Sequence, residues 1–172
     1  MSYLEKLKNI KAFVFDVDGV FTDGSVYLLP EGNMCRVMNV LDGYAVVKAL
    51  KNNYLISVIT GGNDESVKHR IQYLGIKDYY PKSHSKLEDF ENFKAKYHLK
   101  NEEILTMGDD LPDISIMKIS GISACPENSV PEVKEISDYI SPISGGKGAV
   151  RDVIEQVMKI QGKWTEDNTQ SA

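Results

Sequence analysis

Short apolar runs alternate with amphipathic segments along most of the chain. Apolar runs at residues 11–17, 54–59 and 104–107 are each closed by acidic residues, glycine or both, a pattern typical of buried parallel strands. Between the runs the period changes: Val67, Ile71 and Leu74 are spaced as on one helix face, and Gly75 follows as a C-terminal cap. The pattern predicts further helices at 42–52, 85–97, 112–119, 130–137 and 149–160, and short strands at 78–80, 122–125 and 139–140. This order predicts a doubly wound α/β domain with a mainly parallel sheet.

One segment departs from this alternation. Residues 25–29 and 34–39 are two short extended runs, and Pro30, Glu31, Gly32 and Asn33 between them favour a turn. We therefore expect a small β-hairpin insertion at about 24–39 within a single domain of residues 1–161. The polar residues 162–172 are expected to form a flexible tail, in which Trp164 either packs on a neighbouring subunit or lacks order.

The overall charge narrows the range of functions. The 172 residues carry a net charge of −5, with an isoelectric point near 5.2, so the chain has no basic field to attract nucleic acid or an anionic membrane. No apolar run approaches the ~20 residues of a membrane span, and the N-terminus does not resemble a signal peptide. Cys35 and Cys125 show no metal-like spacing and are expected to be reduced thiols. These features predict a cytoplasmic protein.

Chemically active residues gather where the predicted strands end. Asp16 and Asp18 follow the first strand, Thr60 and Gly61 the second, and Asp109 and Asp110 the strand at 104–107. Because the carboxyl ends of parallel strands meet at one edge of a sheet, these groups should converge there. Two converging carboxylate pairs would repel each other unless a cation lay between them, and oxygen ligands without histidine favour Mg²⁺.

This set of residues suits phosphoryl transfer. Asp16 can attack phosphorus and form an aspartyl-phosphate, while Asp18 can act as general acid and then base if the chain turns at Gly19. The Thr60 hydroxyl, the Gly61 amide and the Lys86 ammonium can hold phosphoryl oxygens. Asp109 would complete the metal site, with Asp110 as a ligand or a neighbour of one. Each motif alone is compatible with an ordinary turn or helix cap, but the four together favour a catalytic site.

These residues resemble the haloacid dehalogenase superfamily of phosphatases over residues 11–160. FDVDGVFTDG is similar to its first motif, VITGG to its second, Lys86 to its third and MGDDLPD to its fourth. The resemblance implies the roles given above and a metal contact from the backbone carbonyl of Asp18. Within the fourth motif, the resemblance also implies that Asp113, like Asp110, is a metal ligand or a partner of one.

Two further features resemble the capless branch of this superfamily, typified by 3-deoxy-D-manno-octulosonate 8-phosphate phosphatase. About fifteen residues separate Thr22-Asp23 from the segment NVLDG, too few for a cap domain, and the segment GGKGAVR follows the last short strand. The resemblance implies a phosphorylated sugar-acid substrate from lipopolysaccharide biosynthesis and a homotetramer in which a neighbouring subunit closes each active site.

The chain departs from that branch at two positions. Gly62 stands where the second motif often has arginine, and Leu41 replaces arginine in NVLDG. If those arginines hold the substrate carboxylate, another cation must do so here, and the candidates are Arg70, Lys147 and Arg151. Nine-carbon 2-keto-3-deoxy sugar acid phosphates are therefore alternative substrates.

Two functions of other classes are compatible with parts of the pattern. A signalling receiver domain also combines an α/β sheet with an aspartyl-phosphate, Mg²⁺, a threonine and a lysine. A receiver domain would, however, place its acid pair on the first strand and the phosphorylated aspartate on a central strand. In this chain an Asp-x-Asp pair follows the first strand, and Asp18 supplies a means to hydrolyse the intermediate. A purely structural subunit held together by the hairpin is disfavoured by the intact acids at every motif.

Overall fold

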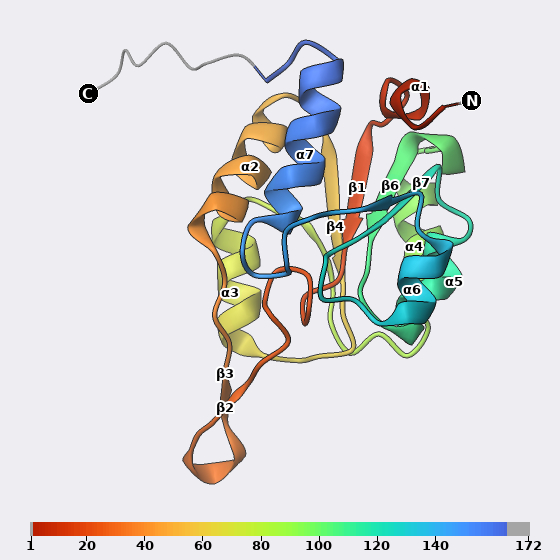
Figure 1. The fold of residues 1–172 in the computed structure, drawn as a ribbon. Coiled ribbons are helices and arrows are strands. Elements are labelled where there is room, and N and C mark those ends of the chain that lie inside the picture. The colour runs from red at the N-terminus through yellow and green to blue at the C-terminus, as the bar shows by residue number, and fades with distance from the viewer. Residues whose placement is uncertain (1, 165–172) are drawn as a thin grey trace.

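The computed structural model describes residues 2–164 of the chain. Its main sheet has six strands in the order β5-β4-β1-β6-β7-β8, and every pair of neighbours is parallel. The central β1 lies between β4 and β6, and the chain crosses over the sheet between consecutive strands (Figure 1). The doubly wound α/β fold predicted from the alternating pattern is confirmed. The strands are β1 (Ala12–Phe15), β4 (Leu55–Ile59), β5 (Asp78–Tyr80), β6 (Ile104–Met107), β7 (Ile122–Cys125) and β8 (Tyr139–Ile140).

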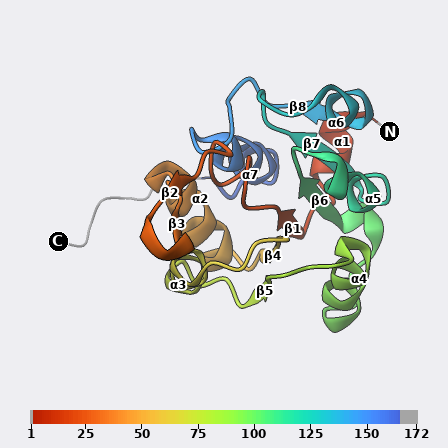
Figure 2. The same cartoon turned by 90° about the horizontal axis from the view of Figure 1, so that it is seen from below.

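Helices cover both faces of this sheet (Figure 2). One face packs against α2 (Val40–Lys51), α3 (Glu65–Tyr73) and α7 (Ala149–Ile160), and α2 and α7 lie directly against each other. The other face packs against α4 (Lys86–Lys96) and α5 (Ile114–Met117), with α6 (Pro131–Ile136) completing a small cluster beside β7.

The side chains of β1 show why its sequence is apolar throughout. Phe13 and Phe15 belong to the cluster under α2 and α7, whereas Ala12 and Val14 belong to the cluster under α4. All four are fully buried. A strand covered on both faces has no solvent-facing positions, so the alternation typical of half-exposed strands is absent and a continuous apolar run results.

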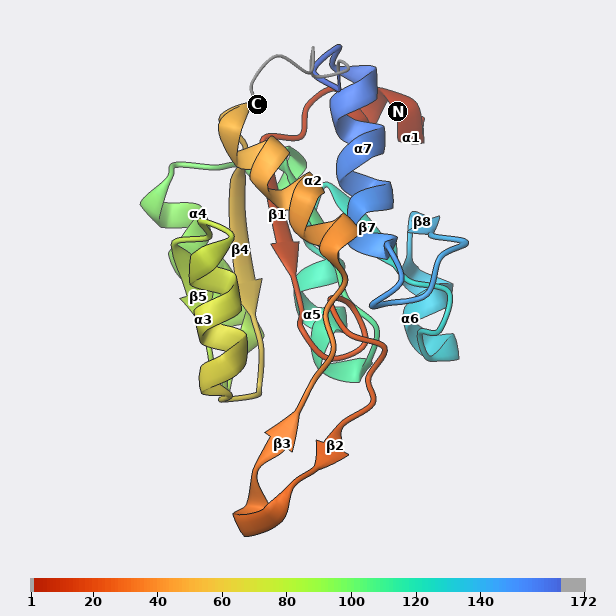
Figure 3. The same ribbon diagram turned by 90° about the vertical axis from the view of Figure 1, so that its left-hand side faces the viewer.

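The insertion between β1 and α2 is a hairpin that projects from the body of the molecule (Figure 3). Its ladder joins β2 (Tyr27–Leu28) to β3 (Met34–Cys35), and the turn between them contains a short 3₁₀ helix, Pro30–Gly32. The ladder is shorter than the extended runs predicted, since the flanking residues leave the pairing. Between β1 and α2 the chain builds only this hairpin, and no cap domain.

Two local features differ from the sequence-based expectations. The short helix α1 (Tyr3–Leu7) was not predicted, although Ser2 and Glu5 have the spacing of a capping box and form one. The helix expected at 112–119 is instead a 3₁₀ turn, Leu111–Asp113, followed by the single α-helical turn of α5. Another 3₁₀ turn, Asn101–Glu103, leads into β6.

Trp164 packs on its own chain. Its ring meets that of Tyr44 edge to face at 6.2 Å, and the cations of Lys48 and Arg151 lie over it. The aromatic ring thus packs against the core cluster between α2 and α7, while the flexibility of residues 162–172 stays a prediction. The remainder of that predicted tail lies outside the described residues. In the part of the chain that the structure describes, no helix combines the length and apolar character that crossing a lipid bilayer requires.

Candidate active site

The carboxyl ends of β1, β4 and β6 open onto a cavity of about 820 Å³. Asp16 and Asp18 follow β1, Thr60 follows β4, Asp109 follows β6, and Lys86 is the first residue of α4. All five line the cavity, together with Gly61. The structure therefore brings together the groups that the sequence pattern placed at one edge of the sheet.

Three carboxylates form a tight cluster at the base of this cavity. Oxygens of Asp16, Asp109 and Asp113 lie within 4.8 Å of one another. Burial, and then the charge of Asp113, raises the pKa of Asp16 to about 6. Burial, and then the charges of Asp16 and Asp113, raise the pKa of Asp109 to about 7. Asp16 and Asp109 thus resist ionisation until positive charge approaches them.

The cluster fits a hard divalent cation. Among the described residues Asp109 Oδ1 is a buried oxygen without a hydrogen-bond partner, a costly arrangement unless something else coordinates it. Clustered carboxylate oxygens are ligands that Mg²⁺ prefers. The Asp18 carboxylate is not part of the cluster, so this residue could contribute to a metal only through its backbone.

Lys86 supplies positive charge within the cluster. Its Nζ lies 2.6 Å from Asp113 Oδ1 and 3.1 Å from Asp16 Oδ1, and only 8% of its side chain is exposed. Although burial opposes its charge, the neighbouring acids Asp113 and Asp16 raise the pKa of Lys86. An ammonium held in this way can contact phosphoryl oxygens bound next to Asp16.

Asp113 is itself fixed by backbone groups. Its Oδ2 accepts hydrogen bonds from the amides of Asp109 (3.1 Å) and Asp110 (3.4 Å). A Cβ atom on Gly108 would lie 2.3 Å from that of Asp113, so only glycine fits at this position. The predicted partner Asp110 is exposed and caps the following turn by accepting a hydrogen bond from Leu111 N. Asp113, and not Asp110, is thus the acid that contacts both the cluster and Lys86.

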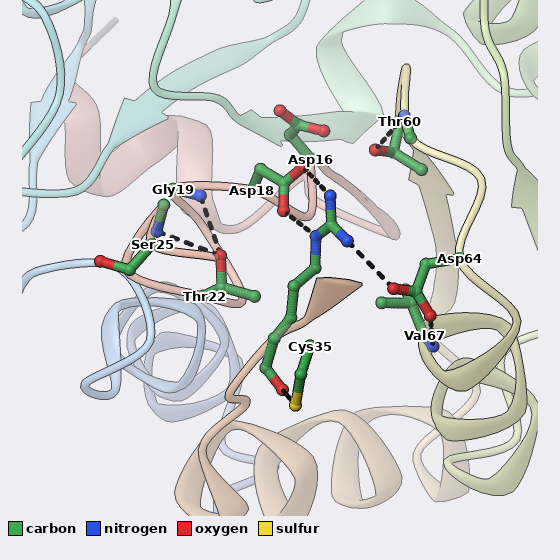
Figure 4. A network of polar contacts seen from close by, with 12 residues as sticks. Asp16, Asp18, Gly19, Thr22, Ser25, Cys35, Thr60, Asp64 and Val67 are labelled. Carbon is green, nitrogen blue, oxygen red and sulfur yellow. Dashed lines mark hydrogen bonds and ion pairs between the residues drawn. The ribbon is translucent and has the colours of Figure 1, made fainter. Parts of the chain in front are cut away.

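The turn after Asp18 brings the first motif back towards Asp109. Gly19 has φ of +84°, and a Cβ atom there would lie 2.0 Å from Asp109 Oδ2. Glycine is therefore required for conformation and for space. Thr22 Oγ1 closes the turn by accepting hydrogen bonds from the amides of Gly19 (3.2 Å) and Gly24 (3.1 Å) (Figure 4). The predicted turn at Gly19 is present.

Thr60 is held with its hydroxyl at the cavity wall. Its Oγ1 accepts a hydrogen bond from Gly62 N at 3.2 Å, and its backbone amide donates to Tyr80 O. The side chain is almost fully buried. Because the hydroxyl oxygen is already an acceptor, its hydrogen is left to be donated to a bound anion.

Arg36 is a site residue that the sequence analysis missed. It follows β3 in the hairpin, and its Nε and Nη2 donate to Asp18 Oδ1 (2.6 Å) and Oδ2 (3.2 Å). Its Nη1 donates to Asp64 Oδ2 at 3.0 Å, so that Asp18 and Asp64 lie on either side of one guanidinium (Figure 4). The sequence did hold a signal, because Arg36 is the one basic residue in the otherwise largely apolar residues 24–39.

The three cations suggested for a substrate carboxylate lie outside the cavity within one chain. Arg70 stacks on Tyr73 and faces Gly43 on α2, and Arg151 lies over the rings of Tyr44 and Trp164. Lys147 lies beside the first motif, because its loop packs on that motif and its Nζ lies 4.0 Å from Asp23.

The upper walls of the cavity are also built by residues that the motifs did not identify. They come from the segment before and at the start of α4, from the turn after β6 and from α5. The three serines and the histidine among them could form hydrogen bonds to a hydroxylated leaving group. These residues are Ser83, His84, Ser85, Leu87, Pro112 and Ser115.

Comparison with known proteins identifies similar chains. A family model described as haloacid dehalogenase-like hydrolase matches residues 72–154. The 3-deoxy-D-manno-octulosonate 8-phosphate phosphatase KdsC of Salmonella typhi is 35% identical over 168 residues, which span 98% of this chain and 89% of that protein.

Solved structures show the same fold. The crystal structure of 3-deoxy-D-manno-octulosonate 8-phosphate phosphatase from Yersinia pestis has a TM-score of 0.91 and 30% identity, and covers 93% of this chain and 86% of its own. The enzyme of that name from Moraxella catarrhalis, solved with magnesium, phosphate and a KDO molecule, has a TM-score of 0.90 and 30% identity over 94% of this chain and 92% of its own.

Proposed function

The chain belongs to the phosphatases of the haloacid dehalogenase-like hydrolase family, and on this basis we propose that Asp16 is its nucleophile. The observation that carries the proposal is the buried cluster of Asp16, Asp109 and Asp113 around Lys86, at the carboxyl edge of the sheet. In this mechanism an Asp16 oxygen forms a bond to phosphorus while the bond to the ester oxygen breaks, which leaves an aspartyl-phosphate.

Proton transfer is assigned to Asp18. Its carboxyl group donates a proton to the leaving ester oxygen and then removes a proton from the water that attacks the aspartyl-phosphate. The acid lies two positions after the nucleophile, and the turn at Gly19 supports their placement at the same cavity. A receiver domain has no use for such a group, because its function depends on a long-lived phosphoaspartate.

The phosphoryl oxygens are held by Thr60, Gly61 and Lys86. Each can donate a hydrogen bond into the cavity, and Lys86 brings a full positive charge. Mg²⁺ would be held by the carboxylates of Asp16 and Asp109 and the backbone carbonyl of Asp18, with Asp113 as a neighbour, and would supply the positive charge that phosphoryl transfer needs.

The substrate proposed is 3-deoxy-D-manno-octulosonate 8-phosphate, whose hydrolysis would serve lipopolysaccharide biosynthesis. Support comes from relatives of that name over 98% of the chain and from the serine and histidine side chains among the residues that line the cavity. Gly62 and Leu41 stand where arginines are expected. A second substrate class, nine-carbon 2-keto-3-deoxy sugar acid 9-phosphates, is therefore the alternative to be tested.

A homotetramer assembled through the hairpins is part of this proposal. Tyr27, Leu28 and Met34 are 61%, 81% and 45% exposed on the projecting hairpin, an unusual arrangement for a free surface. A neighbouring chain that covers them would also close the open cavity. The cytoplasm is the proposed location, where the free thiols of Cys35 and Cys125 remain reduced.

A substrate panel tests the proposal. Phosphate release is measured with eight- and nine-carbon sugar acid phosphates, with Mg²⁺ and with chelator, for the wild-type protein and for Asp16→Asn. We expect the highest kcat/KM with the eight-carbon ester, loss of activity in chelator, and a fall of at least about 10³-fold for Asp16→Asn. Glu132→Gln, an exposed carboxyl on α6, is the matched control. Full activity in chelator, or normal turnover by Asp16→Asn, would show the mechanism to be wrong.

A further inference from the structure

Arg36 connects the hairpin to the catalytic acid. Its side chain is only 9% exposed, although it starts from a hairpin whose other side chains largely face solvent. Two of its nitrogens bind the two oxygens of Asp18, at 2.6 and 3.2 Å. A planar guanidinium that binds both oxygens of a carboxylate fixes the rotation of that carboxylate as well as its position.

The guanidinium is itself fixed from the opposite side. Asp64 Oδ2 accepts from Arg36 Nη1 at 3.0 Å. The other oxygen of Asp64 caps α3 by accepting from the amides of Ser66 (2.8 Å) and Val67 (3.3 Å). Arg36 is therefore held against the end of a helix, and the orientation that it gives to Asp18 rests on a rigid element.

Asp18 would lack this orientation without Arg36. Among the described residues, the Asp18 carboxylate accepts hydrogen bonds only from Arg36, and 39% of the Asp18 side chain is exposed. Asp18 also lies outside the cluster of Asp16, Asp109 and Asp113. An exposed carboxylate with no other partner would sample several rotamers, and few of them would face an ester oxygen bound at Asp16.

Gly62 leaves room for this pair at the cavity wall. A Cβ atom at position 62 would lie 3.8 Å from Asp18 Oδ2 and 4.0 Å from Arg36 Nη2, so any side chain there would begin in contact with both groups. Oδ2 is the oxygen nearer to Gly62 and the one more weakly held by Arg36. It is thus the oxygen of Asp18 best placed to carry the proton to the leaving group.

We propose that Arg36 is a positioning residue that holds Asp18 in the orientation needed for proton transfer to the leaving oxygen. The inference rests on the proposed function, since that function assigns the proton transfer to Asp18. Arg36 does not touch the reacting atoms in this role, and its effect passes through the Asp18 carboxylate.

Two esters that differ in leaving group separate this role from a structural one. kcat/KM reports the steps up to release of the leaving group, and an alkoxide needs a proton far more than p-nitrophenolate does. We expect Arg36→Met to lower kcat/KM about 10²-fold for the best alkyl phosphate of the panel and less than about tenfold for p-nitrophenyl phosphate. Arg36→Lys should recover part of the alkyl-ester rate, because it keeps one charged donor. Asp64→Asn keeps the helix cap but loses the acceptor for Arg36 Nη1, so it should shift the ratio of the two rates in the same direction as Arg36→Met, by a smaller factor.

Other results would overturn the inference. An equal loss on both esters would mean that Arg36 only supports the fold, and unchanged alkyl-ester activity in Arg36→Met would mean that Asp18 does not need it. Both results require an active wild-type protein. A wild-type protein that hydrolyses neither ester would instead remove the proposed function. Solution mass and circular dichroism of each variant show whether it is folded and assembled. If Arg36→Met is not folded, Arg36→Lys takes its place in the comparison of the two esters.

Discussion

The most informative single substitution at the acid cluster is Asp109→Asn. Burial, and then repulsion within the cluster, raise the pKa of Asp109 from 3.8 to about 7, which corresponds to about 4 kcal/mol at 1.36 kcal/mol per pH unit. Because this carboxyl is only partly buried, solvent screening reduces the figure to about 2 kcal/mol. A raised pKa means that the folded state binds the proton more tightly than the unfolded state does. The metal-free protein therefore loses this stability as the pH rises from about 4 to about 7, and the loss is complete above pH 7.

Urea unfolding in chelator at two pH values measures this effect. We expect Asp109→Asn to raise the free energy of unfolding by about 2 kcal/mol at pH 8 and by less than half of that at pH 5. Asp110→Asn is the matched control, because Asp110 is exposed and asparagine caps a helix equally well, so its change should stay within about 0.5 kcal/mol. A variant less stable than the wild type at pH 8 would refute the electrostatic reasoning.

Added Mg²⁺ should reverse the order of the two proteins. A cation that binds only the folded wild type stabilises it by about 2.7 kcal/mol at a concentration of one hundred times Kd. Asp109→Asn removes one of the proposed ligands and should gain much less. The wild type is then the more stable protein in Mg²⁺ and the less stable one in chelator. Equal gains for both proteins would exclude Asp109 as a ligand.

Two further predictions concern packing and assembly. Gly145→Ala should lower the free energy of unfolding by about 1–3 kcal/mol and reduce kcat. The added Cβ atom would lie 1.9 Å from Gly19 O, at the turn that carries Asp18. Urea unfolding measures the change in stability, and phosphate release measures the change in kcat. Unchanged values would mean that the two loops move apart freely. Leu28→Glu changes the most exposed apolar position of the hairpin. It should shift the mass measured by sedimentation from the tetramer towards smaller species, while the circular dichroism spectrum stays unchanged. An unaltered mass would place the interface elsewhere.

Most of the fold could be predicted from the sequence because its central strands are buried on both faces. Continuous apolar runs such as residues 12–15 are then closed by the acids and glycines that carry the chemistry. The strand ends thereby located Asp16, Thr60 and Asp109 without knowledge of any contact. Segments with weak local signals were harder: the capping box of Ser2 and Glu5 precedes only five helical residues, and the helix after Asp110 is reduced to one turn.

The remaining site residues depend on tertiary contacts that spacing does not express. Asp113 was included only through its motif, and its contact with Lys86 joins residues 27 positions apart. Arg36 reaches Asp18 only because the hairpin stem folds back across the cavity edge, which no local pattern encodes. Trp164 stands in a polar segment without a local pattern, and its contact with Tyr44 of α2 depends on the helix pair that covers the sheet.

The hairpin connects the two halves of the proposed mechanism. Its outer strands expose the apolar side chains that a neighbouring chain would cover, and its stem carries the arginine that binds Asp18. If a neighbouring chain closes the cavity, as proposed above, the same insertion would link closure to the orientation of the acid. Any movement of the stem on assembly would reach Asp18 through a single side chain anchored on Asp64. The effect of assembly on rate should therefore be greater for alkyl esters, which need the proton from Asp18, than for p-nitrophenyl phosphate.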